Sequence, residues 1–144
     1  KAKFLERYTQ IMTTDIHLYK GVEELLSYLT EKSISWGIVT NKSAKYTLPI
    51  LEKLNWHKQT CAIICPEDVR QTKPDPEGVF KALNSINASI EGSFYVGDHE
   101  RDIETAKNAN VKSIACTYGY YQSDPLSWGA DYIIDSPTEI KNIL

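Results

Sequence analysis

The chain has 144 residues, of which 42% are hydrophobic and 24% are charged, and its formal net charge is −3. These values are typical of a single globular domain. No stretch approaches the roughly 20 uninterrupted apolar residues of a membrane-spanning helix, so we expect no membrane partner. The sequence also lacks the clustered lysine and arginine of a nucleic-acid surface. Small molecules or other proteins are the expected partners.

The three cysteines, Cys61, Cys65 and Cys116, predict neither a disulfide nor a metal site. Cys61 and Cys65 lie in one strand-like run, where four steps of about 3.3 Å place them roughly 13 Å apart, beyond the reach of a disulfide. The sequence has no C-x-x-C pair and no histidine at ligand spacing, so it indicates no zinc or redox motif. Free thiols are typical of a reducing compartment, and we expect a cytoplasmic protein.

Apolar stripes at helical spacing alternate with short apolar runs, and these patterns predict helices and strands. Helices are predicted at residues 4–12, 22–30, 43–54 and 100–109. Two further helices are predicted to begin at Asp75 and Pro76 and at about Pro137. Strands are predicted at residues 33–40, 61–65, 93–97, 111–117 and 131–134. Strands that alternate with helices of about ten residues form right-handed β-α-β units, which predicts an α/β fold with a parallel sheet. The run at 33–40 becomes wholly apolar, as in a strand covered on both faces.

Polar residues directly after the strands are the first candidates for a site, because open parallel sheets bind ligands at the carboxyl ends of their strands. Thr40 and Asn41 offer a hydroxyl and successive backbone N–H groups that can hold phosphoryl oxygens. Lys73 is biased toward an extended conformation by Pro74, and its ammonium can neutralise phosphate charge. Read alone, Thr40 and Asn41 are more simply a strand-ending turn, and Lys73 is as well explained as a solvated lysine.

Asp98 and Asp102 are four residues apart at a strand-to-helix turn. If the helix begins near Asp98, both carboxylates face one side of it. Such oxygen ligands suit Mg²⁺, which uses one or two carboxylates together with phosphate and water. Gly97 allows close approach of the backbone. For a lone aspartate, helix capping would be the favoured explanation.

Threonine, lysine and an acidic pair follow successive strands in this order, and in this the sequence resembles the haloacid dehalogenase superfamily of phosphohydrolases. Residues 38–42, Ile-Val-Thr-Asn-Lys, look like its second motif. Residues 73–76 look like the third motif and residues 97–102 like the fourth. Within the superfamily the chain is similar to phosphoglycolate phosphatases and to the related phosphatases of N-acetylmuramic acid 6-phosphate. The resemblance covers nearly the whole chain and implies a Rossmann-like core.

The resemblance implies Mg²⁺-dependent hydrolysis of a small phosphorylated metabolite through an aspartyl-phosphate intermediate. If the family's roles apply at the matching positions, Thr40 and the Asn41 amide would hold the phosphoryl group, and Lys73 would stabilise the nucleophile and the transferred phosphate. Asp98 would ligate Mg²⁺, and Asp102 would support it from the adjacent turn. The expected catalytic residues are therefore Thr40, Asn41 and Lys73, and the expected metal residues are Asp98 and Asp102.

The family's first motif, Asp-x-Asp-Gly-Thr, is absent from this sequence. In the family it supplies the nucleophile at the end of the first strand, which lies in mid-sheet between the strands of the second and fourth motifs, and a helical cap follows. The resemblance therefore implies that residues 1–14 are the last cap helix, 15–20 the linker and 21–144 an incomplete core. We expect this chain alone to be an inactive carboxyl-terminal fragment. Its unpaired strand edges favour low stability or self-association.

One alternative stays open, namely a catalytically inactive core of the same fold that serves as a binding or interaction module. A phosphoacceptor signalling domain also combines Asp, Thr, Lys and Mg²⁺. That class requires an early acidic pair, whereas Thr40 and Lys73 precede the acids here. The order of the residues argues against it.

Overall fold

The computed structural model describes residues 16–144, in which helices alternate with short strands. The helix predicted at residues 4–12 lies outside this part of the chain. Four short 3₁₀ helices, η1 to η4, are interspersed with the longer elements: Trp56–Lys58, Pro66–Asp68, Pro125–Ser127 and Pro137–Asn142. The longer elements are α2 (Val22–Glu31), β1 (Gly37–Val39), α3 (Ala44–Lys53), β2 (Ala62–Ile64), α4 (Glu77–Ser85), β3 (Phe94–Gly97), α5 (Glu100–Ala109), β4 (Lys112–Cys116) and β5 (Tyr132–Ile134). No helix of the described chain is long and apolar enough to cross a membrane.

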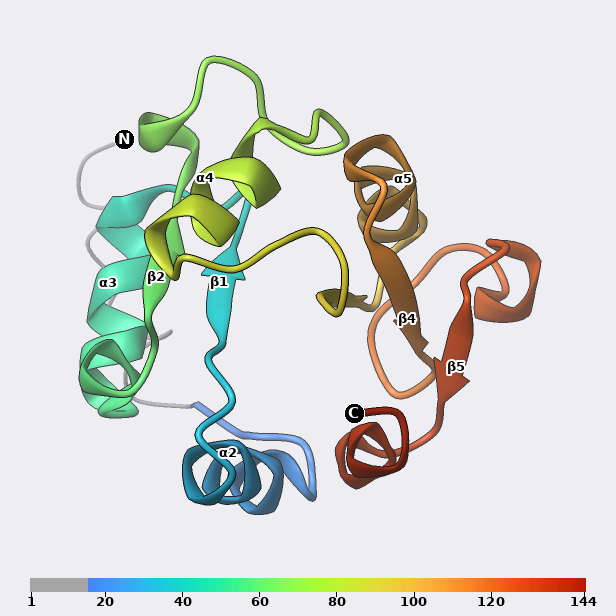
Figure 1. The fold of residues 1–144 in the computed structure, drawn as a ribbon, viewed down its shortest axis with the longest axis horizontal. Helices are drawn as coiled ribbons and strands as arrows, with labels where there is room; N and C mark the ends of the chain where they lie inside the picture. Colours follow the sequence, from blue (N-terminus) through green and yellow to red (C-terminus); the bar gives the residue numbers. More distant parts are fainter. Residues whose placement is uncertain (1–15) are drawn as a thin grey trace.

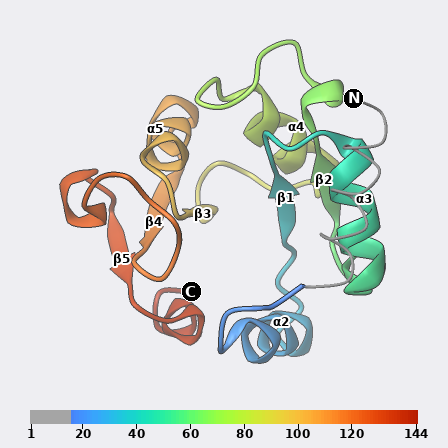
Figure 2. The same cartoon turned by 180° about the vertical axis from the view of Figure 1, so that it is seen from behind.

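All strand pairs are parallel, which confirms the predicted α/β class (Figure 1). The strands form two small sheets, β1-β2 and β3-β4-β5. Within residues 16–144 no ladder joins β1 to β3, although these are the neighbouring strands of the two sheets in Figure 2. This is the place where the sequence resemblance puts a further central strand.

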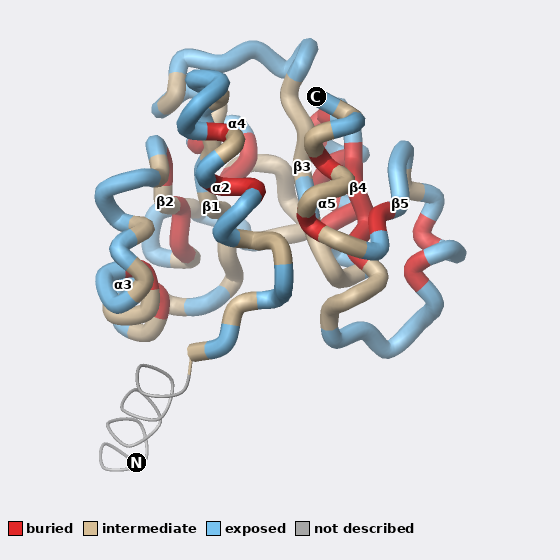
Figure 3. Tube along the Cα trace, turned by 90° about the horizontal axis from the view of Figure 1, so that it is seen from below, coloured by how far each residue is buried: buried red, intermediate tan, exposed pale blue. Residues whose placement is uncertain are grey.

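The strands are buried to different degrees (Figure 3). On β4, which is paired on both sides, Ile114 is fully buried. On β3, which has one partner strand among the described elements, Val96 is 41% exposed. On β1, Gly37 is exposed and the next two residues are half-buried, so the prediction of a strand covered on both faces is wrong for this chain. Its residues are apolar, but among the described elements β1 has a partner strand on one side only.

The main core lies around β4 and β5, where apolar side chains of α2 pack. Its buried members are Leu25, Leu26, Leu29, Ile114, Cys116, Ile134 and Ile140. A second cluster joins Ala82 of α4 to Ala62 and Ile64 of β2. Burial of these side chains provides the main favourable free energy of folding, at about 25 cal/mol per Å² of apolar surface.

Element boundaries differ from the sequence prediction by at most four residues. Helix α5 begins and ends where the prediction places it. Helix α4 begins one residue later than predicted, with Pro76 at the N-cap, although the Asp75 carboxylate still accepts a hydrogen bond from the Glu77 N–H at 2.9 Å. Pro49 does not end α3, because the helix continues through it to Lys53.

Backbone groups of β1 point alternately toward β2 and toward the unpaired side, as in any strand. The Thr40 N–H donates to the Ile64 carbonyl at 3.0 Å, so the Val39 groups point away from β2. The Val39 carbonyl accepts a hydrogen bond from the Tyr95 hydroxyl of β3 at 3.3 Å. One tyrosine side chain therefore bridges the two sheets where no strand does.

We predict that the Val39 amide exchanges with solvent much faster than the Thr40 amide in this chain. A bonded amide exchanges only after local opening, whereas the Val39 N–H faces the unpaired side. Hydrogen exchange followed by NMR measures both rates, and Thr40 is the internal control. Slow exchange at both positions would contradict an open edge.

Candidate active site

The end of β1 carries the first predicted site residues, Thr40 and Asn41. The Thr40 hydroxyl oxygen accepts a hydrogen bond from the Lys42 N–H at 3.0 Å, which leaves the hydroxyl proton available to donate. The Asn41 side chain reaches another loop, where its Oδ1 accepts from the Lys73 N–H at 3.1 Å and its Nδ2 donates to the Lys73 carbonyl at 3.2 Å. The structure thus brings the second and third motif-like segments together.

Lys73 crosses from the loop before α4 to α5, where its ammonium pairs with Asp102 at 2.6 Å. The side chains of Lys73 and Asp102 are only 13% and 9% exposed. The Lys73 ammonium also lies 5.8 Å from the centroid of the Tyr95 ring, a favourable position for a cation. Burial raises the pKa of Tyr95, and the charge of Asp102 raises it further, so this phenol stays protonated at neutral pH. The peptide bond between Lys73 and Pro74 is cis.

Asp102 lies in the first turn of α5, and its carboxylate is fully engaged. Oδ1 accepts from Lys73, and Oδ2 accepts from the His99 N–H at 3.2 Å. Helix α5 begins at Glu100 with His99 as its N-cap, so Asp98 lies outside the helix. The expectation that Asp98 and Asp102 share one helical face is therefore wrong, because the helix begins two residues too late.

Two glycines make room for the two carboxylates. A Cβ at Gly119, just after β4, would lie 2.2 Å from the Asp98 Cβ and 2.3 Å from its Oδ2. A Cβ at Gly97 would lie 2.2 Å from the Asp102 Cβ. Sequence reasoning gave Gly119 no role in the site, although residues 118–120 look like a segment of phosphoglycolate phosphatases and follow a predicted strand.

The donor chemistry of Asp98 fits a hard cation. Its half-buried carboxylate makes no hydrogen bond or ion pair with any described residue, and carboxylate oxygens are ligands that Mg²⁺ prefers. Within residues 16–144, no three histidine, cysteine or acidic side chains gather closely enough to hold a metal by themselves. Asp102 is occupied by Lys73 and His99, so Asp98 is the described carboxylate best placed to bind Mg²⁺.

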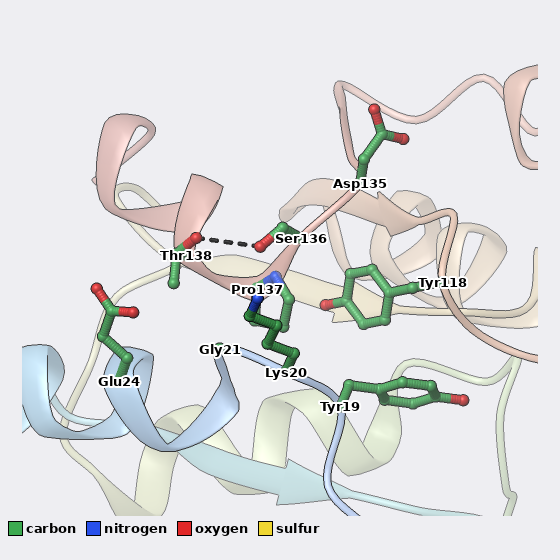
Figure 4. Close-up of a pocket in the computed structure, with 9 residues that line it drawn as sticks. All are labelled: Tyr19, Lys20, Gly21, Glu24, Tyr118, Asp135, Ser136, Pro137 and Thr138. Atoms are coloured by element: carbon green, nitrogen blue, oxygen red, sulfur yellow. Dashed lines mark hydrogen bonds between the residues drawn. The ribbon is translucent and has the colours of Figure 1, made fainter.

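A pocket of about 500 Å³ lies beside this edge, between residues 19–24 and the segments that follow β4 and β5 (Figure 4). The rings of Tyr19 and Tyr118 meet edge to face there, with centroids 5.1 Å apart. Burial raises the pKa of Tyr118, and its hydrogen bond with Cys116 and the charge of Asp98 add to the shift. Tyr118 therefore keeps its hydroxyl proton. It directly precedes Gly119, the glycine against which Asp98 packs.

The comparisons with known proteins agree with this arrangement. The family described as "Haloacid dehalogenase-like hydrolase" matches residues 1–116. The chain belongs to this family. The resemblance seen in the sequence is thereby confirmed.

Several curated relatives of the chain are phosphatases. The chain is 34% identical to an N-acetylmuramic acid 6-phosphate phosphatase of Pseudomonas putida, in a match that covers all of this chain and 66% of that protein. It is 36% identical to a phosphoglycolate phosphatase of Xanthomonas campestris, over 96% of this chain and 63% of that protein. The chain therefore spans just under two thirds of the length of these relatives.

Solved structures show the same fold. A crystal structure of a predicted phosphoglycolate phosphatase from Haemophilus somnus matches with a TM-score of 0.88 and 25% identity, over 96% of this chain and 62% of that one. The two small parallel sheets are thus part of a haloacid dehalogenase-like core.

We predict that Asp102→Asn lowers the free energy of unfolding by about 3 kcal/mol, because it leaves the buried Lys73 ammonium without its counter-charge. Urea unfolding followed by circular dichroism measures the loss. The matched control is Glu24→Gln, which breaks the 2.7 Å pair with Lys141, where Glu24 is 66% exposed. That control should cost less than about 1 kcal/mol. Equal small losses in both variants would contradict a buried structural pair.

Proposed function

We propose that this chain is the carboxyl-terminal part of a Mg²⁺-dependent phosphatase that hydrolyses a small phosphomonoester. The observation that carries the proposal is the grouping of a hydroxyl, an ammonium and an uncommitted carboxylate at the carboxyl ends of parallel strands. Thr40 directly follows β1, Asp98 directly follows β3, and Lys73 lies in the loop between η2 and α4, where it contacts Asn41 and Asp102. The named phosphatases among its relatives support the same reaction class.

The proposed reaction has two displacement steps at phosphorus. A carboxylate oxygen of an aspartate from outside these 144 residues forms a bond to phosphorus, and the bond to the leaving alcohol breaks with proton transfer to its oxygen. Water then attacks phosphorus, the bond to the aspartate breaks, and inorganic phosphate and the free carboxylate result. Both steps are redox-neutral.

The residues of this chain would bind and orient the phosphoryl group. The Thr40 hydroxyl donates to a phosphoryl oxygen, and the Lys73 ammonium balances negative charge on phosphate and nucleophile. Asp102 keeps that ammonium in place through its ion pair. When bound, Mg²⁺ would be held by Asp98 and would offset the charge of the phosphate.

Two further features of the chain enter the proposal. The open edges of β1 and β3 would pair with a strand from the remainder of the protein, or with a second copy of this chain in its absence. Cys65 and Cys116 are free buried thiols, which supports a reducing cytoplasmic location.

We predict Mg²⁺-dependent phosphate release from an aryl phosphate only when the chain is joined to an upstream segment that carries the nucleophile. In that protein Asp98→Asn and Lys73→Ala should each reduce turnover by orders of magnitude, while Lys112→Ala, an exposed lysine on β4, should not. A colorimetric phosphate assay measures phosphate release by the short chain, the longer protein and its three variants. Inactivity of the longer protein would favour a binding module, and activity of the short chain would mean that its nucleophile lies within these residues.

We further predict that Gly119→Ala raises the Mg²⁺ concentration needed for half-maximal activity, because the new methyl group must displace the Asp98 side chain. Gly92→Ala is the matched control, since a Cβ there meets nothing within 4 Å, and its positive φ of 80° imposes a backbone strain of about 1 kcal/mol. Titration of activity with Mg²⁺ measures the Mg²⁺ requirement of both variants and distinguishes an effect on metal binding from general backbone strain. An unchanged Mg²⁺ requirement in Gly119→Ala would remove Asp98 from the metal site.

A further inference from the structure

The side chain of Asn41 pairs with both backbone groups of a residue 32 positions away. Its carbonyl oxygen accepts from the Lys73 N–H at 3.1 Å, and its amide nitrogen donates to the Lys73 carbonyl at 3.2 Å. Only a side-chain amide carries both an acceptor and a donor in this geometry. The Asn41 side chain is therefore committed to Lys73 and is not directed at a phosphoryl group.

Lys73 is consequently held at both ends. Asn41 fixes its backbone from the loop after β1, and Asp102 fixes its ammonium from α5. A lysine side chain is a flexible four-carbon stem, so an ammonium tied only at its tip would move with the loop that carries it. One anchor lies in the loop after β1 and the other in helix α5, and together they define where the charge lies.

We propose that the Asn41 side chain is a positioning residue for Lys73, which places the ammonium and the Thr40 hydroxyl on the same phosphoryl group. This inference rests on the proposed phosphatase function. The backbone N–H of Asn41 stays available to an anion, and the inference concerns the side chain alone. Because Asn41 directly follows Thr40, it ties the second motif-like segment rigidly to the third.

The first test does not require activity. In Asn41→Ala the Lys73 N–H loses its acceptor, so its hydrogen exchange, measured by NMR, should become at least several-fold faster than in the unaltered chain. The exchange rate of the Thr40 amide, which bonds to Ile64, should change little. A Lys73 amide that exchanges equally fast with and without the Asn41 side chain would overturn the proposed contact.

The second test is a double-mutant cycle in the longer, active protein. Asn41→Ala should lower kcat by about 10²-fold with a smaller change in KM, as expected for a misplaced catalytic group. In a Lys73→Ala background the same substitution should cost less than about twofold, because a residue that acts through Lys73 has nothing left to position. Equal losses in both backgrounds would overturn the inference and indicate direct contact with phosphate.

Asn108→Ala is the matched control, since Asn108 donates its side-chain amide to the neighbouring Pro74 carbonyl at 2.9 Å. It removes a bond to the same loop but leaves the Lys73 peptide intact, and we expect less than a threefold change in kcat. A loss as large as that of Asn41→Ala would show that general loop rigidity, not the Lys73 peptide, matters. If the unaltered longer protein releases no phosphate, the proposed function fails, and the exchange experiment still decides whether Asn41 holds Lys73.

Discussion

The ion pair between Lys73 and Asp102 connects two halves of the molecule that share no backbone ladder within residues 16–144. Lys73 belongs to the half built on β1 and β2, and Asp102 belongs to the half built on β3, β4 and β5. Removing either charge would leave the other buried and uncompensated, which is strongly destabilising. The hydrogen bond from Tyr95 to Val39 crosses the same boundary. This polar cluster fixes the position of the ammonium, and together with the apolar contact of Val79 with Ala109 and Val111 it joins the two halves.

The two acidic residues of the fourth motif-like segment have different surroundings. Asp102 is buried on α5 with both oxygens engaged, so its contribution is to hold Lys73 and to cap the helix. Asp98 lies before the helix, and its side chain occupies the position where a Cβ at residue 119 would clash with it. Because α5 begins after Asp98, two identical side chains four residues apart lie in different surroundings, one paired within the helix and one before it.

The distribution of buried surface follows from strand pairing. β4 has a parallel neighbour on each side and is almost wholly buried, whereas β1 and β3 have one described neighbour each and stay partly exposed. A parallel strand exposes unpaired backbone groups on any side that lacks a partner. The apolar sequence of β1 is therefore better suited to an interior strand than to the position it has in this chain.

Local sequence determined the element types, the parallel α/β class and the family, because helical and strand periodicities and short motifs are written in neighbouring residues. The bounds of α5 and the placement of Thr40 and Asp98 directly after strands could be predicted in this way. The partners of those residues could not. Asn41 meets Lys73, Lys73 meets Asp102 and Asp98 meets Gly119 across 21 to 32 positions of sequence. Such contacts depend on how the loops converge once the strands have paired, and only the tertiary structure fixes that convergence.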